Sequence, residues 1–212
     1  MSRGFFLVVE GPEGAGKSTL ATALAARLVS AGFDVVPVRE PGGTPPAEHA
    51  RQALLDPSSD LDPHTELLFV AAARAHLVQA VIRPALEAGR LVISDRYDLS
   101  TTAYQAAGRG LPLDVVAAVN LVATRGLRPD LTLVLDVTPE EGRRRQAAVG
   151  KGHDRFERED GAFHERVRAA YRSAAGEGIV HLDGSEAPGL VVEAAWRALM
   201  DAGAGTLRRR PG

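Results

Sequence analysis

The sequence predicts an α/β fold in which helices cover both faces of a five-stranded parallel sheet. Three observations lead to this prediction. Short apolar runs alternate with segments of helical apolar spacing, polar clusters follow the ends of the apolar runs, and 212 residues are enough for one sizeable domain. The apolar content of 45% and charged content of 25% are ordinary for a globular protein. We therefore expect one domain over residues 1–212.

The chain begins with an expected strand, helix and strand. Residues 4–10, GFFLVVE, form a continuous apolar run, which is typical of a buried parallel strand. Residues 17–32 have helical apolar spacing and end at Gly32, a common residue after a helix. Residues 33–40 predict a second strand. It should lie toward an edge of the sheet, because Pro37 cannot donate a hydrogen bond to a neighbouring strand.

A long helix and two further strands follow. Residues 62–89 have an apolar helical pattern that Pro84 should bend or divide. Residues 90–97, RLVISDRY, predict a strand that ends in polar groups. Residues 131–142 predict a strand that leads into the start of a helix.

The last expected elements are a strand at residues 178–184 and a closing helix at residues 186–202. Ligands of parallel α/β sheets bind beyond the carboxyl ends of the strands. The polar clusters of this chain lie at such ends, at residues 10–18, 39–44 and 95–105 and at Asp136. A ligand site is therefore expected at this edge of the sheet.

Bulk composition narrows the class of protein. The net charge of −2 indicates no basic field for nucleic acid, and the basic tail LRRRPG is interpreted as a solvated terminus. The lack of cysteine excludes disulfides, thiolate zinc sites and cysteine nucleophiles. We expect no stretch near the roughly 20 apolar residues of a membrane span, and the run FFLVV is too short for a signal-peptide core. The expectation is a cytoplasmic protein without a nucleic-acid or membrane partner.

A phosphate-binding pattern lies between the first strand and the first helix. Residues 10–20, EGPEGAGKSTL, contain G-x-x-x-x-G-K-[ST], whose backbone N–H groups surround phosphate oxygens. Lys17 should reach the β- and γ-phosphates of a nucleoside triphosphate, and Ser18 should ligate Mg²⁺. A chance match with a helix cap is the alternative. The residues expected around the ATP phosphates are Gly11, Pro12, Glu13, Gly14, Ala15, Gly16, Lys17, Ser18 and Thr19.

Two carboxylates near this loop need a role. Glu13 places a negative charge inside an anion cradle, which is costly unless a positive partner lies nearby. Asp95 ends an apolar strand and is a candidate to hold Mg²⁺ directly or through water. A salt bridge between Asp95 and Arg96 is the alternative, and the two interpretations are compatible.

The sequence lacks the motifs of other nucleotide-binding classes, and this favours a small kinase that transfers a phosphoryl group to an acceptor. The chain contains neither the D-x-x-G nor the N-K-x-D pattern of a GTPase, and a molecular motor needs more chain. A small kinase instead needs an acceptor pocket that excludes water. Residues 40–105 supply candidates for its walls, namely Glu40, Arg51, Arg74, Arg96, Tyr104 and Gln105.

These residues stand in motifs through which the chain resembles the bacterial thymidylate kinases over nearly its whole length. The motifs are EGPEGAGKST, REPGGT (39–44), AAARAHLVQAVIRPAL (71–86), DRYDLSTTAYQAAGRG (95–110), RPDLTLVLDVTPE (128–140) and DRFE (154–157). DRYDLSTTAYQ together with REPGGT is highly specific. The resemblance implies a three-layer P-loop fold of the nucleoside monophosphate kinase type. It also implies Mg²⁺-dependent transfer of the ATP γ-phosphoryl group to dTMP, within a homodimer. Helices 62–89 and 113–124 are apolar enough to supply the dimer face.

The resemblance assigns roles in an acceptor pocket for dTMP. Glu13 would accept a hydrogen bond from the 3′-hydroxyl, Arg51 and Arg96 would hold the phosphate, and Arg74 would bind the base edge. Tyr104 would fill the space that a ribose 2′-hydroxyl needs. The full expected set is Glu13, Glu40, Pro41, Arg51, Phe69, Val70, Arg74, Arg96, Ser100, Thr101, Tyr104 and Gln105.

The resemblance also implies a mobile lid at about residues 148–160. One subgroup of the family has an arginine at the position of Gly14, whereas the bacterial subgroup uses basic lid residues instead. The candidates here are Lys151, Arg155 and Arg158, with Arg155 in the matching D-R-[IF]-E context. Arg155 is therefore expected to be catalytic, together with Lys17, Asp95 and Arg96. Without the resemblance, a solvated charged loop would be the favoured interpretation.

One departure from the family pattern keeps other functions open. The family commonly has a phenylalanine, stacked on thymine, where this chain has Val70, and Phe69 lies one residue earlier. One residue is about 100° of helix rotation, so we favour Phe69 in the core and Val70 against the base. The alternatives are a kinase for dCMP, a nucleoside or a small metabolite, and a nucleotide-binding regulatory module without turnover.

Overall fold

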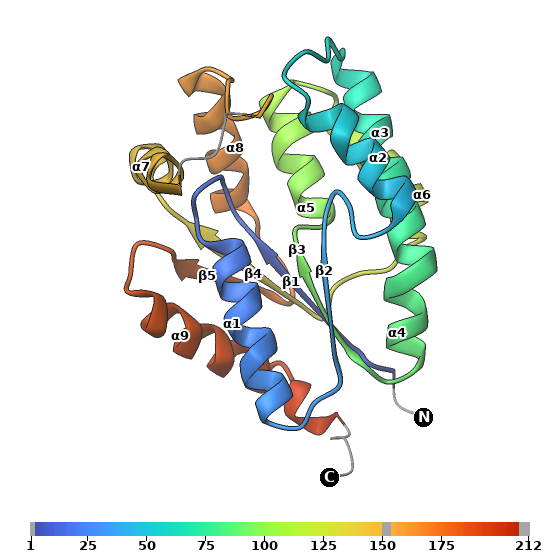
Figure 1. Cartoon of the computed structure of the whole chain (residues 1–212), viewed down its shortest axis with the longest axis vertical. Helices are drawn as coiled ribbons and strands as arrows, with labels where there is room; N and C mark the ends of the chain where they lie inside the picture. The colour runs from blue at the N-terminus through green and yellow to red at the C-terminus, as the bar shows by residue number, and fades with distance from the viewer. Residues whose placement is uncertain (1–2, 150–153, 208–212) are drawn as a thin grey trace.

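A computed structural model describes residues 3–149 and 154–207, and its centre is a five-stranded parallel sheet. The strands lie in the order β2-β3-β1-β4-β5 (Figure 1). Their bounds are β1 Phe5–Glu10, β2 Val35–Arg39, β3 Leu91–Asp95, β4 Leu131–Asp136 and β5 Ile179–Asp183. The predicted sheet is therefore confirmed. The expected edge position of Pro37 is confirmed too, because β2 is an outer strand.

Helices connect and cover the strands. Their bounds are α1 Lys17–Ser30, α2 Pro45–Leu55, α3 Pro63–Leu77, α4 Arg83–Glu87, α5 Asp98–Thr101, α6 Leu113–Thr124, α7 Pro139–Val149, α8 Gly161–Ser173 and α9 Pro188–Asp201. Two π-helical segments, η1 Val78–Ile82 and η2 Thr102–Gly108, and the short 3₁₀ turn η3 Ala204–Thr206 complete the set. Of these elements, α2, α5, α8, η2 and η3 were not among those expected from the sequence.

The two faces of the sheet pack against different helices. Phe5, Leu7 and Val9 of β1 are buried in a cluster with α1 and α9. Phe6 and Val8 point the other way, into a cluster with the segment from α3 to α4. Successive side chains of a strand face opposite sides, so the continuous apolar run of β1 fills both cores. This arrangement fixes the carboxyl ends of the strands, where the polar clusters lie.

The helical run Pro63–Glu87 corrects one expectation. It contains 25 residues, and by length and composition it is long enough and apolar enough to cross a membrane, contrary to the interpretation of the sequence. The core helix of a globular protein meets the same criterion. Here Leu77, Val78 and Ile82 are fully buried against the sheet. Pro84 lies in the first turn of α4, so the expected division at this proline is confirmed.

Candidate active site

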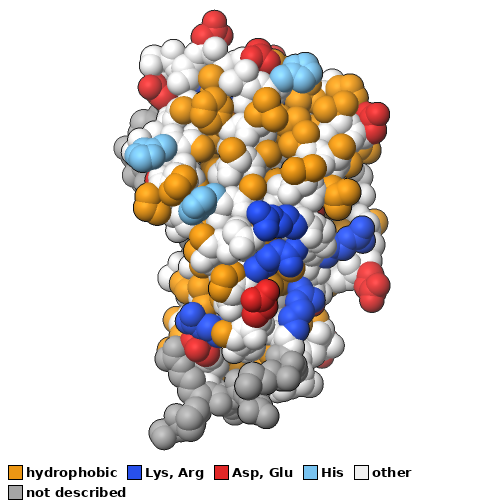
Figure 2. Space-filling model, turned by 90° about the vertical axis from the view of Figure 1, so that its right-hand side faces the viewer, with side chains coloured by type: hydrophobic (Ala, Val, Ile, Leu, Met, Phe, Trp, Pro, Cys, Tyr) orange, Lys and Arg blue, Asp and Glu red, His pale blue; other side chains and the backbone are white. Residues whose placement is uncertain are grey.

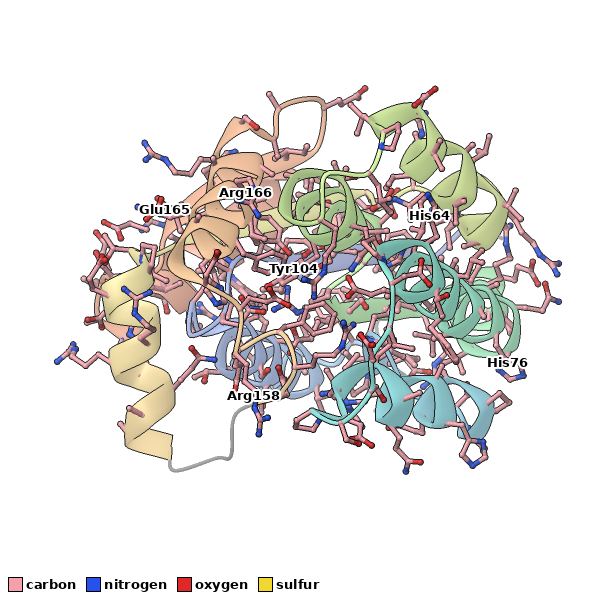
Figure 3. All side chains as sticks on the ribbon, turned by 90° about the horizontal axis from the view of Figure 1, so that it is seen from above. His64, His76, Tyr104, Arg158, Glu165 and Arg166 are labelled. Atoms are coloured by element: carbon pink, nitrogen blue, oxygen red, sulfur yellow. The ribbon has the colours of Figure 1, made fainter. Side chains whose placement is uncertain are left out.

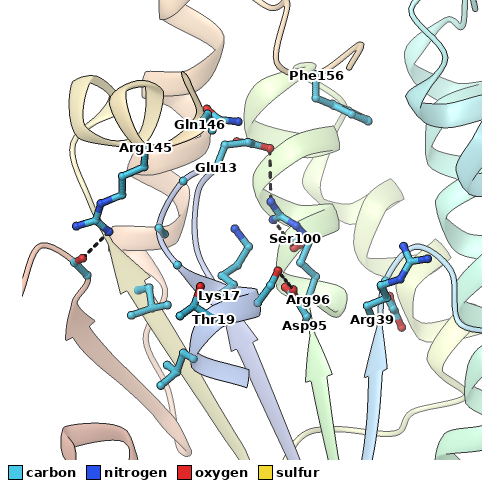
Figure 4. A pocket seen from close by; sticks show the side chains of 18 of the residues that line it. Glu13, Lys17, Thr19, Arg39, Asp95, Arg96, Ser100, Arg145, Gln146 and Phe156 are labelled. Atoms are coloured by element: carbon cyan, nitrogen blue, oxygen red, sulfur yellow. Dashed lines mark hydrogen bonds and ion pairs between the residues drawn. The ribbon is translucent and has the colours of Figure 1, made fainter. Parts of the chain in front are cut away.

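A cavity of about 940 Å³ opens beside the phosphate loop and the ends of β2 and β3. Figure 4 shows side chains of the loop, of β3 and of α7 converging on it. The expected site residues that line it are Glu13, Gly14, Ala15, Gly16, Lys17, Ser18, Thr19, Glu40, Pro41, Arg51, Val70, Arg74, Asp95, Arg96, Ser100, Thr101, Tyr104 and Gln105. Gly11, Pro12, Phe69 and Arg155 are not part of this lining. The sequence-based selection therefore converges on one cavity.

The phosphate loop bends sharply between β1 and α1. Gly11, Gly14 and Gly16 have φ values of 140°, 71° and 93°, in the region that favours glycine. A Cβ atom at Gly14 would collide with the backbone of Gly142 in α7. The arginine that one subgroup carries at this position would therefore require α7 to move.

Lys17 is folded back along this loop. Its side chain is buried, and Nζ donates to the Pro12 carbonyl oxygen at 2.6 Å. Burial and the positive charge of Arg96 lower the pKa of Lys17 to about 8, although Glu13 and Asp95 oppose this shift. Lys17 is thus held inside the loop that the sequence predicts to surround a polyphosphate.

Ser18 and Asp95 form an oxygen pair at the start of α1. Ser18 Oγ donates to Asp95 Oδ2 at 2.5 Å. The salt bridge considered between Asp95 and Arg96 does not occur among the described contacts, since the Arg96 guanidinium binds other groups (Figure 4). A hydroxyl beside a carboxylate is a donor set that suits a hard divalent cation.

Arg96 lies at the junction of the loop and the acceptor side of the cavity. Its φ of 75° is unusual for a residue other than glycine. Nη1 donates to Gly11 O at 3.2 Å, to Ser100 Oγ at 3.2 Å and to Tyr171 Oη at 3.0 Å. Nη2 donates to Tyr104 Oη at 3.1 Å. One guanidinium thus orients groups from three different segments.

Glu13 faces this guanidinium. Its Oε1 accepts hydrogen bonds from Tyr104 Oη and, at 3.5 Å, from Arg96 Nη2. Burial raises the pKa of Glu13, but Arg96 and Lys17 outweigh burial and hold that pKa below its usual value. The positive charge that Glu13 needs therefore comes from Arg96 and Lys17. Oε2 is buried, has no hydrogen-bond partner in the described chain and lies 4.0 Å from His164 Nδ1.

Tyr104 packs at the centre of the molecule. Viewed from above, it lies between the helices that surround the cavity (Figure 3). Its ring makes edge contacts with Phe156, Phe163 and Tyr171 at centroid distances of 5.7, 6.2 and 6.3 Å. These contacts fix the ring while its hydroxyl binds Glu13, so Tyr104 forms a rigid part of the cavity wall.

Arg74 is almost wholly engaged with the protein. It is 1% exposed, and four of its hydrogen bonds go to Glu40 Oε2, Thr101 Oγ1, Asn120 Oδ1 and Tyr97 O at 2.6 to 2.8 Å. An arginine has five N–H groups, so one N–H of Nη2 is left for a ligand. Glu40 supplies the negative charge that this buried guanidinium needs.

Phe69 and Val70, the two candidates for contact with the thymine ring, lie in different surroundings, as favoured from the sequence. Phe69 is half-buried and packs on Ala47, Ala50 and Ala73. Val70 lines the cavity. Successive side chains of α3 point in directions about 100° apart. The aromatic ring of Phe69 therefore faces α2, and the smaller side chain of Val70 faces the cavity.

Arg155 lies outside the cavity lining, between α2 and α3. Its Nε donates to Leu54 O at 3.1 Å, and its Nη2 donates to Glu66 Oε2 at 2.5 Å. It therefore joins the end of α2 to α3 and does not line the cavity. Arg158 is exposed (Figure 3), and Lys151 lies outside the described residues.

The α7 helix supplies residues that were not expected from the sequence. Arg144 and Arg145 line the cavity. Arg145 is oriented by Glu141 Oε1 at 2.6 Å and by Gly184 O at 2.8 Å (Figure 4). The run of three arginines at 143–145 was the available signal. No comparable signal marked Tyr171, whose hydroxyl reaches Glu10 and Ser100 from α8.

Comparison with known proteins agrees with this geometry. A family model described as thymidylate kinase matches residues 9–195. The chain is 54% identical over 169 residues to the thymidylate kinase of Pseudomonas putida, covering 79% of this chain and 80% of that protein. It is 48% identical over 171 residues to the thymidylate kinase of Deinococcus radiodurans, covering 81% and 82%. Identity to the thymidylate kinase of Ectopseudomonas mendocina is 51% over 179 residues, covering 84% and 85%.

Proposed function

The chain belongs to the thymidylate kinase family, and we propose that it transfers the γ-phosphoryl group of ATP to dTMP, giving dTDP and ADP. The observation that carries this proposal is the environment of Glu13. One of its oxygens is held by Tyr104 and Arg96, and the other is buried, takes no hydrogen bond from the described residues and lies 4.0 Å from His164 Nδ1. A hydroxyl donor of the acceptor sugar would satisfy that second oxygen.

Positioning and charge account for the chemistry. The bond from the γ-phosphorus to the β,γ-bridging oxygen breaks, and a bond to an oxygen of the dTMP phosphate forms. A phosphate monoester is already largely ionised at pH 7, so this acceptor needs no catalytic base. Arg51 and Arg96 would hold the acceptor phosphate, and Lys17 would stabilise charge on the transferred group.

Mg²⁺ is part of the proposal. The adjacent oxygens of Ser18 and Asp95 fit it, because Mg²⁺ is usually held by one or two protein oxygens together with substrate phosphates. When bound, the cation neutralises part of the negative charge of the phosphates. Ser18 and Asp95 would orient it from the start of α1 and the end of β3.

We further propose one domain with a lid at about residues 148–160, in which Arg155 acts on the transferred phosphoryl group after closure. Arg155 would first have to leave Glu66 and the end of α2. Arg144 and Arg145 of α7, in contrast, already line the cavity. The absence of cysteine fits a reducing compartment, so we place the reaction in the cytoplasm.

A homodimer through α3 and α6 is also proposed. Figure 2 shows hydrophobic side chains gathered over the upper half of one face of the molecule. Leu68 of α3 and Leu113, Leu121 and Val122 of α6 are 60%, 62%, 64% and 77% exposed. Exposed apolar patches of this kind mark interaction surfaces. The proposal includes no nucleic-acid or membrane partner.

The function is tested by incubating the protein with ATP, Mg²⁺ and a panel of monophosphates while ADP release is followed. We expect dTMP to have the highest kcat/KM and the Lys17→Met variant to be inactive although folded. A preference for dCMP would support the rival kinase that the departure at Val70 left open. ADP release that needs no acceptor would contradict the proposal.

A further inference from the structure

Glu66 is a buried carboxylate that the proposed reaction does not use, and it contacts Gln105 of the cavity lining. Its side chain on α3 is fully buried. Gln105 Nε2 donates to Oε1 at 2.7 Å, Arg109 Nε donates to both oxygens at 3.2 and 3.0 Å, and Arg155 Nη2 donates to Oε2 at 2.5 Å. A buried carboxylate is costly unless it is paired, and two guanidinium groups compensate this one.

Glu66 determines which end of the Gln105 amide faces the cavity. An ionised carboxylate can only accept hydrogen bonds, so the donor end of the amide, Nε2, must turn toward Glu66. Gln105 lines the cavity. Its Oε1 takes no hydrogen bond from the described residues, because the one bond of this side chain runs from Nε2 to Glu66. The acceptor end is therefore left for a ligand.

Arg74 presents the opposite polarity in the same cavity. A guanidinium can only donate, and one N–H of Nη2 is not used by the partners described above. The wall thus offers a donor from Arg74 and an acceptor from Gln105. Thymine and uracil carry an acceptor at O4 next to a donor at N3–H, whereas cytosine carries a donor at N4 next to an acceptor at N3. With position 4 of the base at Arg74 and N3 at Gln105, only the first pattern is complementary to this wall.

We infer that Glu66 is a positioning residue that fixes the Gln105 amide and thereby selects thymine and uracil over cytosine in the acceptor nucleotide. The inference rests on the proposed function, because it concerns the acceptor site of that reaction. Glu66 itself touches no substrate. Its effect passes through the orientation of one amide group.

The Glu66→Gln substitution tests this role. The new side chain has nearly the same shape but only one oxygen, and Arg109 and Arg155 can only donate to it. Its amino group then faces Gln105, whose amide turns to present Oε1 to that group and Nε2 to the cavity. The polarity of the wall at Gln105 reverses, and cytosine becomes the better partner there.

The readout is kcat/KM for dTMP, dUMP and dCMP. We expect the dTMP:dCMP ratio to fall about tenfold or more in Glu66→Gln. The dTMP:dUMP ratio should stay the same, because the two bases share the relevant edge. A merely structural role would lower all three values in proportion, and an unchanged dTMP:dCMP ratio would overturn the inference.

Glu66→Asp is the matched control, because it keeps a group that only accepts. Its dTMP:dCMP ratio should stay close to that of the wild type. An equal fall in Glu66→Asp and Glu66→Gln would show that packing, not polarity, matters. Failure of the proposed function is distinguishable, since the wild type would then leave dTMP unphosphorylated.

If Glu66→Gln does not fold, NMR on the wild type tests instead whether the Gln105 amide stays bonded to Glu66 when dTMP binds. The Gln105 side-chain amide signals are assigned by their loss in Gln105→Met. We expect one Nε2 proton to be protected from solvent exchange both without and with dTMP, because it stays bonded to Glu66. Loss of that protection when dTMP binds would mean that the amide turns over, and would contradict the inference.

Discussion

The carboxylate of Glu13 is held by two neighbours that themselves line the cavity. Tyr104 and Arg96 bind one oxygen and leave the other buried without a partner in the described chain. A negative group is therefore tolerated in the phosphate loop because positive charge surrounds it. The same arrangement leaves Glu13 able to accept a hydrogen bond from an acceptor sugar.

We predict that Glu13→Gln weakens this contact specifically. Hydrogen bonds to charged groups contribute about 1.5–3 kcal/mol, so kcat/KM for dTMP should fall about ten- to a hundredfold. A 3′-deoxy analogue of dTMP lacks the contact and should be penalised less by the substitution. The coupling is measured by combining both enzymes with both acceptors. Equal losses for the two acceptors would mean that Glu13 only shapes the loop.

The pKa of about 8 for Lys17 predicts a pH-dependent uptake of protons. Below pH 8 the free protein carries the charge already, whereas above pH 8 it must bind a proton to meet the phosphates of ATP. Calorimetry at pH 8.5 in two buffers of different ionisation enthalpy should therefore show proton uptake that Lys17→Met lacks. At pH 6.5 the difference between the two proteins should vanish. An identical proton balance at pH 8.5 would refute the shifted pKa.

Local sequence patterns pointed to most of the residues that line the cavity but not to the contacts of Arg155. Lys17, Ser18 and Asp95 follow from a loop pattern and a strand end, because their neighbours are fixed by the fold. Arg155 differs, since its partners Leu54 and Glu66 lie 101 and 89 residues away. No periodicity in the chain indicates such pairings, and only packing of α2, α3 and the segment after α7 creates them.

At the scale of elements, the strands were predictable, whereas several helices, including α2 and α8, were not. The strands β1, β3 and β4 are buried on both faces, so each can be recognised in the sequence as a continuous apolar run. The α2 helix begins with two prolines, which normally suggest a loop and are tolerated here only in the first turn. The α8 helix buries a narrow stripe of Phe163, Val167 and Tyr171. Such a short amphipathic segment is less distinct than an apolar run.

The packing of α8 on η2 gives a stability prediction. A Cβ atom at Gly108 would lie 2.6 Å from Phe163 Cε2 and 3.1 Å from Val167 Cγ2. Gly108→Ala should therefore lower the free energy of unfolding by about 1–3 kcal/mol through overpacking, as measured by chemical denaturation. The matched control is Gly161→Ala, where the added atom meets nothing within 4 Å. Equal stability of the two variants would mean that α8 shifts freely.

At the scale of the whole molecule, the exposed apolar face of α3 and α6 predicts self-association. Val122→Asp should place a charge in the dimer interface, and burying an unpaired charge is costly. Sedimentation should therefore show a dimer for the wild type and a monomer for this variant. Val29→Asp on α1, at a position 53% exposed and outside this face, should remain dimeric. A monomeric wild type would contradict the proposed interface.

In the proposed reaction the cavity holds ATP at the phosphate loop and dTMP at the facing wall, so the phosphoryl group passes directly from one nucleotide to the other. The most direct test follows the label from ATP that is labelled in its γ-phosphoryl group, with Mg²⁺ and dTMP present. We expect the label in dTDP, in equal amount to the ADP formed, and almost none in inorganic phosphate. Label released as inorganic phosphate at the same rate with and without dTMP would contradict transfer to dTMP at this site.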